Sequence, residues 1–167
     1  MEITRQADYA VRTMVYLSGL PFGGRVSTAA ISQIESIPRP FLSKVISRLA
    51  TAGLVITTRG MGGGVALSRS PDEITLLQVI ESVDGPIWLI SCVRHPGACE
   101  QEPYCAVRDT WMEIQTRVLR DLNSVTMGEL ARLQAEHDAA AVHSQLREPS
   151  RLVLAHAVPY EKERALA

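Results

Sequence analysis

Three short helical segments followed by a hairpin constrain the fold of this 167-residue chain more than any other feature. Apolar residues recur at near-helical spacing over residues 3–17, and Ser27 and Thr28 are N-cap candidates for a second, short helix. After the break Ile37-Pro-Arg-Pro40, a third helix is expected to start at Pro40 and to end at Gly53. The second and third helices are therefore separated by the short turn that a helix-turn-helix requires.

A β-hairpin is expected directly after these helices. The runs Leu54-Val-Ile-Thr-Thr-Arg59 and Val65-Ala-Leu-Ser68 flank the turn Gly60-Met-Gly-Gly-Gly64. Two short strands around a glycine turn are typical of a hairpin. Three helices and a hairpin follow the order of a winged helix-turn-helix. We therefore predict a mainly α fold, with a winged helix-turn-helix DNA-binding domain over residues 1–84.

The second half of the chain is predicted to contain further helices around a cysteine loop. Thr75-Leu-Leu-Gln78 is a capping box that opens a fourth helix, and the proline- and glycine-containing loop 85–105 follows it. A long helix comes next, and a second capping box, Thr126-Met-Gly-Glu129, opens a final one. We expect residues 106–136 to be dimerisation helices, because a long amphipathic helix outside the DNA-binding core commonly packs against a partner subunit. Packing within its own chain is the alternative.

The periodicity fades from about His137, so residues 137–167 are expected to form a mobile tail.

Composition excludes several classes of protein. Hydrophobic residues make up 46% of the chain, charged residues 21%, and the net charge is −1, which is ordinary for a globular protein. The sequence contains no apolar run long enough to span a bilayer and no signal-peptide pattern, so we expect a cytoplasmic protein without a membrane partner. Residues 1–75 hold eight Lys/Arg against five Asp/Glu, whereas residues 76–167 hold nine against thirteen. A basic N-terminal part is suited to contact with nucleic acid.

The third helix and the hairpin carry the residues expected to bind DNA. The helix is predicted to lie in the major groove, where Ser43 and Lys44 would reach base edges. Arg59 immediately precedes the glycine turn and is suited to a narrow minor groove. The alternatives are an ordinary solvated helix face and a phosphate-binding loop, but the turn lacks the Gly-Lys-Ser/Thr ending of a P-loop. The remaining candidates are expected to bind phosphate (Arg39, Ser47 and Arg48) or to let the hairpin backbone approach DNA (Gly62 and Gly63).

The chain's three cysteines, Cys92, Cys99 and Cys105, all lie in the predicted loop. Clustered thiols in a chain without disulfide partners indicate a metal or a redox reaction. An inter-chain disulfide, a zinc site, an oxidant sensor with bare thiols and a metal-free dimerisation module are the alternatives. An enzyme with Cys99 or Cys105 as nucleophile and His95 as base is disfavoured, because no recognisable orienting carboxylate accompanies the histidine.

Four sequence features together resemble one known family, and the resemblance covers roughly residues 1–135. They are Thr4-Arg-Gln-Ala-Asp-Tyr-Ala-Val11, Arg59-Gly-Met-Gly-Gly-Gly64, Leu76-Leu-Gln-Val-Ile-Glu81 and the three spaced cysteines before a long helix. They are similar to those of the Rrf-type (IscR/NsrR-like) iron–sulfur-dependent transcription regulators. The resemblance implies a homodimeric winged-helix factor that binds double-stranded DNA at a palindromic operator. It also implies that Cys92, Cys99 and Cys105 are ligands of an iron–sulfur cluster.

The resemblance leaves open the fourth ligand, which each cubane normally requires. In the nitric-oxide-sensing branch of the family an aspartate in the first helix of the partner subunit supplies it, and Asp8 holds that position here. The other branch uses a histidine three residues beyond its last cysteine, where this chain has Arg108. The implied centre is a 4Fe–4S cluster, with 2Fe–2S still possible. His95 is the rival fourth ligand, and Glu100 and Glu102 are weaker ones.

The expected function follows from this resemblance. The protein is expected to be a repressor, without enzymatic activity, whose operator binding depends on a cluster that senses nitric oxide, redox or iron status. A winged-helix regulator that uses zinc or bare thiols as a redox sensor is the alternative.

Overall fold

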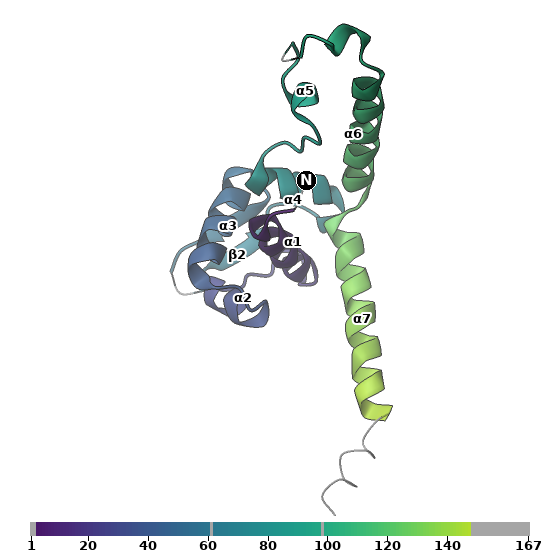
Figure 1. The fold of residues 1–167 in the computed structure, drawn as a ribbon. Coiled ribbons are helices and arrows are strands. Elements are labelled where there is room, and N and C mark those ends of the chain that lie inside the picture. Colours follow the sequence, from purple (N-terminus) through teal and green to yellow (C-terminus); the bar gives the residue numbers. More distant parts are fainter. Residues whose placement is uncertain (1–2, 61, 98, 148–167) are drawn as a thin grey trace, which may run out of the picture. The chain divides into compact units, whose positions relative to one another are not determined.

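The computed structural model describes residues 3–60, 62–97 and 99–147 of the chain. It separates into two compact units, Met1–Leu133 and Gln134–Ala167, which are considered individually. Figure 1 traces the chain from the N-terminal helices to helix α7.

Two predicted local signals bound the N-terminal helices, although the third helix begins at Arg39, one residue before its predicted start. Ser27 caps the second helix by accepting a hydrogen bond from the Ala30 N–H. Gly53 lies just past the end of the third helix with φ +70°, and its N–H donates to the carbonyl of Ala50. With the following N–H this completes a Schellman motif, so the predicted glycine stop is confirmed. The helices are α1 (Arg5–Ser18), α2 (Thr28–Ile34) and α3 (Arg39–Thr51).

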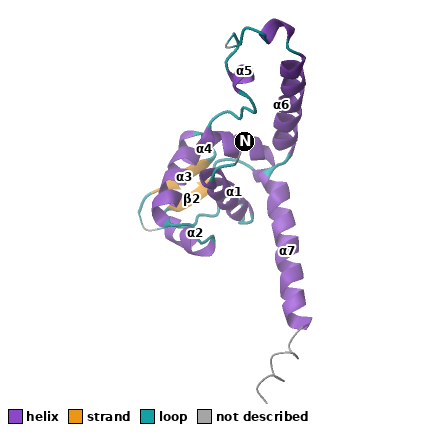
Figure 2. Ribbon diagram, in the orientation of Figure 1, coloured by secondary structure: helices purple, strands orange, loops and turns teal. Residues whose placement is uncertain are grey.

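The hairpin consists of β1 (Val55–Thr58) and β2 (Gly64–Leu67), which pair antiparallel. A third segment joins its edge, because Val65 and Val26 exchange two backbone hydrogen bonds, at 2.8 and 3.1 Å. The hairpin is thereby fixed to the loop between α1 and α2. Figure 2 shows this small sheet beside α1 and α3.

The second half of unit Met1–Leu133 is also helical, and both predicted capping boxes are present. Thr75 and Gln78 cap each other reciprocally at the start of α4, and Thr126 and Glu129 do so at the start of α7. The elements are η1 (Pro71–Glu73), α4 (Leu76–Asp84), α5 (Ser91–Arg94), η2 (Glu102–Tyr104), α6 (Ala106–Ser124) and α7 (Met127–Arg147).

Helix α7 is longer than the sequence suggested. It continues to Arg147, so the prediction that regular structure ends near residue 136 is wrong. The run Ala139–Ala141 interrupts the apolar periodicity, but alanine has the highest intrinsic helix propensity. In unit Gln134–Ala167, Gln134 Nε2 donates to Asp138 Oδ1 at 2.9 Å, an i,i+4 pair that supports the same helix. Residues 148–167 of the predicted tail lie outside the described residues.

One hydrophobic core connects the DNA-binding elements to the start of α7. Met14 of α1, Leu49 of α3 and Val79 of α4 are fully buried in it. Met127 is also fully buried, and its N–H donates to the Ile74 carbonyl at 2.8 Å. The junction between α6 and α7 is therefore anchored at the start of α4. Within the described residues, no helix is long and apolar enough to cross a membrane.

Candidate DNA-binding surface and cysteine loop

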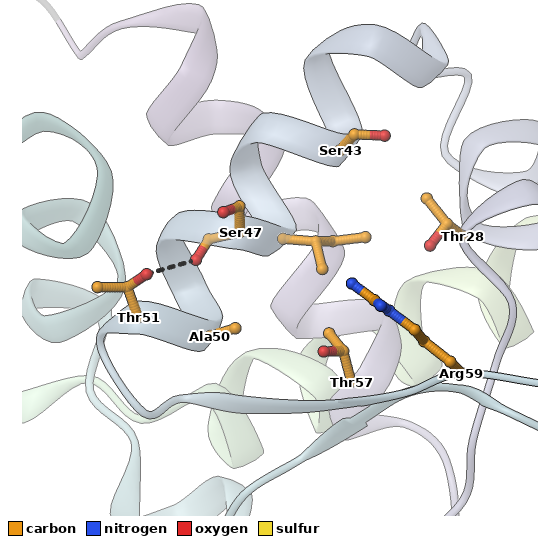
Figure 3. A pocket seen from close by; sticks show the side chains of 8 residues that line it. Thr28, Ser43, Ser47, Ala50, Thr51, Thr57 and Arg59 are labelled. Carbon is orange, nitrogen blue, oxygen red and sulfur yellow. Dashed lines mark hydrogen bonds between the residues drawn. The ribbon is translucent and has the colours of Figure 1, made fainter.

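A groove of about 740 Å³ lies between α3 and the hairpin and contains several of the predicted DNA-binding side chains. Ser43 and Ser47 line it from α3, and Arg59 points from the hairpin into the space between α3 and Thr28 (Figure 3). Thr57 of β1 lines the same groove. These hydroxyl and guanidinium groups can donate to phosphates or to base edges. Three segments far apart in the sequence therefore present one polar surface.

Thr28 and Thr57 also belong to this surface, although neither was predicted to bind DNA. Thr28 is the first residue of α2, where a helix-turn-helix approaches the DNA backbone, and this position was an available signal. The sequence signal for Thr57 was weaker. Thr57 lies two positions before Arg59, and alternate residues of a strand share a face.

The other flank of α3 is lined by a second groove, of about 600 Å³. Lys44 and Arg48 lie here, with Ser43 and Ser47 common to both grooves and Gln6 contributed by α1. The two grooves thus contain all the predicted polar candidates of α3 except Arg39, which is exposed in the first turn of the helix.

Arg48 has a partner inside the chain. Its Nη1 donates to the backbone carbonyl of Val83, in the last turn of α4. A cation at that end of a helix also interacts favourably with the helix dipole. Arg48 was predicted to bind phosphate, and the other N–H groups of its guanidinium could do so only from the position that this bond fixes.

The glycines of the hairpin turn are required by the backbone itself. Gly62 has φ +76°, a region that disfavours side chains. At Gly63 a Cβ atom would lie 2.3 Å from the carbonyl oxygen of Thr58, so only glycine fits without movement of the turn. The tight turn places Arg59 at its edge. The predicted role of Gly62 and Gly63 in approaching DNA stays a prediction.

The three cysteines lie on the segment that connects α4 to α6. Cys92 is half-buried in α5, Cys99 is exposed, and Cys105 is the half-buried N-cap residue of α6. All three are free thiols. Among the residues that the structure describes, no three His, Cys, Asp or Glu side chains converge so as to hold a metal. The donor set of three thiols fits an iron–sulfur cluster chemically, since thiolates are the ligands that such clusters prefer.

An ion pair closes the middle of this loop. Arg108 Nη2 lies 2.8 Å from Glu102 Oε1, and the second carboxylate oxygen, Oε2, accepts the N–H of Gly97. A cavity of about 570 Å³ beside the pair is lined in part by Cys99 and Glu100. Glu102 is therefore already engaged, which makes it a poor fourth ligand, whereas Glu100 is exposed.

The two other candidate ligands are exposed. Asp8 lies in the first turn of α1, its side chain is 57% exposed, and its nearest cation is Arg12 Nη1 at 3.9 Å. An exposed ion pair of this length contributes little stability. Because the Asp8 side chain is exposed, its carboxylate is accessible to another subunit. His95 is exposed at the C-cap of α5.

Helix α6 is divided between two environments. Its C-terminal half packs on the core through Leu119 and Leu122. Its N-terminal half leaves apolar side chains open to solvent in the single chain, including Trp111 and Ile114 at 37% and 36% exposure. The C-terminal half therefore packs within its own chain, whereas packing of the N-terminal half against a partner subunit stays a prediction.

Comparison with known proteins places this arrangement in a family. The family model Rrf2, described as an iron-dependent transcriptional regulator, matches residues 3–133. The HTH-type transcriptional regulator IscR of Cronobacter sakazakii is 31% identical over 152 residues, which cover 90% of this chain and 93% of that protein. IscR of Aliivibrio salmonicida is 33% identical over 130 residues, covering 78% of this chain and 77% of that protein.

Solved structures of the same kind share the fold. The structure titled CymR, the global cysteine regulator of B. subtilis, superposes with a TM-score of 0.68 at 29% identity and covers 80% of this chain and 98% of that one. T. potens IscR superposes with a TM-score of 0.65 at 24% identity, covering 82% of this chain and 90% of that one. The predicted winged-helix fold is confirmed, and the relatives are named as regulators, not as enzymes. This chain is therefore a DNA-binding transcription regulator of the Rrf2 family.

Proposed function

We propose that this regulator is a homodimeric, cytoplasmic repressor whose binding to a palindromic operator is controlled by an iron–sulfur cluster on Cys92, Cys99 and Cys105. The observation that carries the proposal is the position of three free thiols between the DNA-binding elements and α6. The family description as iron-dependent supports iron as the metal.

The cysteine thiolates of one subunit would hold the cluster, with Asp8 of the partner subunit as fourth ligand and 4Fe–4S as the favoured form. A 2Fe–2S centre with other ligands is the second possibility. A cluster held there supplies a centre that reacts with nitric oxide and oxidants and depends on iron supply. The engagement of Glu102 by Arg108 supports Asp8 over Glu102.

The end of α4 is a direct route from the loop to the DNA-binding helices. The Val83 carbonyl accepts a hydrogen bond from Arg48 of α3. The neighbouring Asp84 carboxylate accepts one from Thr4 Oγ1 at 2.7 Å, and Thr4 is the N-cap of α1. These two contacts lie in the last turn of α4, next to the loop. A change in the position of the loop would therefore be passed to α1 and α3 through this turn. A few kcal/mol of differential stabilisation is enough to change operator occupancy.

The exposed apolar half of α6 supports the proposed dimer. Trp111 and Ile114 would leave solvent if two copies of the helix packed together. A two-fold dimer presents two copies of α3 and of the hairpin, and such symmetry matches a palindromic duplex.

Zinc or bare thiols remain the second candidate chemistry for the same loop. Three free thiols, one of them exposed, are suited to reversible oxidation.

Anaerobic purification tests these functions directly. We expect native mass spectrometry to find a dimer that carries iron and sulfide, visible absorbance, and binding to a palindromic duplex that nitric oxide or cluster removal changes. Cys99→Ala should lose the visible absorbance, whereas Ser91→Ala, a loop substitution that keeps every thiol, should retain it. Full cluster absorbance in Cys99→Ala would overturn the ligand assignment, and a colourless protein containing zinc would favour the second chemistry.

A further inference from the structure

Gln115 is a buried polar side chain in a helix whose surface is otherwise largely exposed. It is 5% exposed, and among the described residues it is the buried member of α6. Its Nε2 donates to the Ile87 carbonyl at 2.6 Å, and its Oε1 accepts the Leu89 N–H at 2.9 Å. One amide therefore binds the peptide groups on both sides of Trp88. Buried amides are retained where such pairing satisfies them.

The two peptide groups belong to the segment that enters the cysteine loop. Helix α4 ends at Asp84, Gly85 turns the chain with φ +78°, and Ile87 is buried. Helix α5, which contains Cys92, begins shortly after Leu89. The hydrogen bonds of Gln115 thus fix the chain just before the first cysteine.

The other end of the loop is fixed to the same helix. Cys105 is the N-cap residue of α6, and Gln115 lies about 15 Å further along that helix at 1.5 Å per residue. The entry and the exit of the loop are therefore both tied to one rigid element.

We propose that Gln115 is a positioning residue for the cysteine centre. By holding Ile87 and Leu89 against α6, it fixes the place at which the chain enters the loop, and with it the position of Cys92 relative to Cys105. This inference rests on the proposed function for its metal-dependent consequence. The effect on the loop itself does not depend on a metal.

The test compares two substitutions in α6 that lower stability for different reasons. Gln115→Met keeps the length of the side chain and removes both hydrogen bonds, leaving two peptide groups without their partner. Leu119→Ala weakens the packing of α6 on the core and leaves the Gln115 hydrogen bonds in place. If Gln115→Met does not fold, Gln115→Glu is measured in its place, with the alkylation of Cys92 as its readout, because it keeps the acceptor for the Leu89 N–H and loses only the donor to the Ile87 carbonyl.

Two measurements are made on the metal-free dimer or monomer as purified. Hydrogen exchange at the Leu89 amide should rise about tenfold in Gln115→Met, as expected for the loss of a buried hydrogen bond. The rate at which Cys92 is alkylated, relative to Cys99, should also change. In Leu119→Ala the exchange rate at Leu89 and the alkylation rate of Cys92 relative to Cys99 should both stay at the wild-type value, once corrected for global unfolding. Unchanged exchange and alkylation in Gln115→Met would overturn the positioning role even if the wild type binds no cluster.

The third measurement uses the protein after anaerobic reconstitution with iron and sulfide. Gln115→Met should lose its cluster to a chelator severalfold faster than wild type and should show altered visible circular dichroism. Leu119→Ala should match the wild type in both, despite a lower Tm. Identical cluster retention and dichroism in Gln115→Met would contradict the inference. Failure of the wild type to bind iron would instead contradict the proposed function.

Discussion

Arg108 Nη2 lies 2.8 Å from Glu102 Oε1, so an ion pair ties the cysteine loop to the first turn of α6. Both side chains are largely withdrawn from solvent, at 19% and 15% exposure. An arginine is always protonated and has no lone pair to offer a metal. Arg108, three residues beyond the last cysteine, thus holds the loop against α6.

Breaking this ion pair should loosen the loop without unfolding the protein. In Glu102→Gln the charge attraction to Arg108 and one strong acceptor for the Gly97 N–H are weakened, at a cost of about 1 kcal/mol. We expect severalfold faster hydrogen exchange at Gly97 and faster alkylation of Cys99, with little change in Tm. Glu100→Gln, an exposed carboxylate on the same loop, is the control and should leave both rates unchanged. Equal effects of the two substitutions would contradict a specific role for the pair.

Arg48 should contribute to stability more than to phosphate binding, because it donates to the Val83 carbonyl. Arg48→Ala is expected to lower the free energy of unfolding by about 1 kcal/mol. It should leave the salt dependence of operator binding close to that of the wild type. Denaturant titration and binding measured over a range of salt concentrations check the two effects.

Arg39→Ala is the matched comparison for Arg48→Ala, since Arg39 is exposed in the first turn of the same helix. If Arg39 contacts a phosphate, its loss should reduce the slope of log K against log salt by about 1 per site. The same reduction in Arg48→Ala, without loss of stability, would show that Arg48 leaves Val83 for the DNA.

Local signals in the sequence predicted most of the elements correctly. Ser27, Gly53 and the capping box at Thr75 act on backbone groups within a few residues, so their effect can be read from neighbouring positions. Helix α7 was misjudged because its apolar periodicity stops at Ala139–Ala141 although its helix propensity does not.

Contacts between distant segments were beyond the sequence. A glutamine in an amphipathic helix is expected to face solvent. Gln115 is buried instead, and its amide forms hydrogen bonds with two peptide groups of a distant segment, so that all these polar groups are paired. Arg48 likewise has the polar character of a DNA contact, but its hydrogen bond to the Val83 carbonyl could not be read from the sequence. The spacing of the three cysteines along the chain determines their order on the loop, but not the distances between their sulfur atoms.

Adjacent glycines of the hairpin turn should respond very differently to alanine. At Gly63 the new Cβ would meet the Thr58 carbonyl at 2.3 Å, so the turn must open, at about 1–3 kcal/mol. At Gly62 no atom lies within 4 Å of the new Cβ, and the cost is that of φ +76°, about 1–2 kcal/mol. Because the displaced turn carries Arg59, Gly63→Ala should weaken operator binding more than Gly62→Ala in a gel-shift titration. A larger loss of affinity in Gly62→Ala would imply that the close approach to DNA occurs at Gly62 instead.

Replacing Asp8 should separate the fourth-ligand role from a surface role. Its side chain is 57% exposed, and its ion pair with Arg12 Nη1 is long, at 3.9 Å. Asp8→Ala should therefore change the free energy of unfolding of the metal-free protein by less than about 1 kcal/mol. If Asp8 of the partner subunit is a cluster ligand, the substitution should alter the visible spectrum and speed cluster loss. Asp8→Cys should restore a stable cluster with a different spectrum, because a thiolate replaces the carboxylate.

Arg12→Gln is the control for Asp8, because it breaks the same weak contact and leaves the carboxylate in place. Arg12 also binds Glu35 Oε2 at 3.3 Å, so some loss of stability is expected from this variant. Its cluster spectrum should nevertheless equal that of the wild type. If Asp8→Ala retains the wild-type spectrum and rate of cluster loss, the fourth ligand lies elsewhere, and the exposed His95 is the residue to replace next.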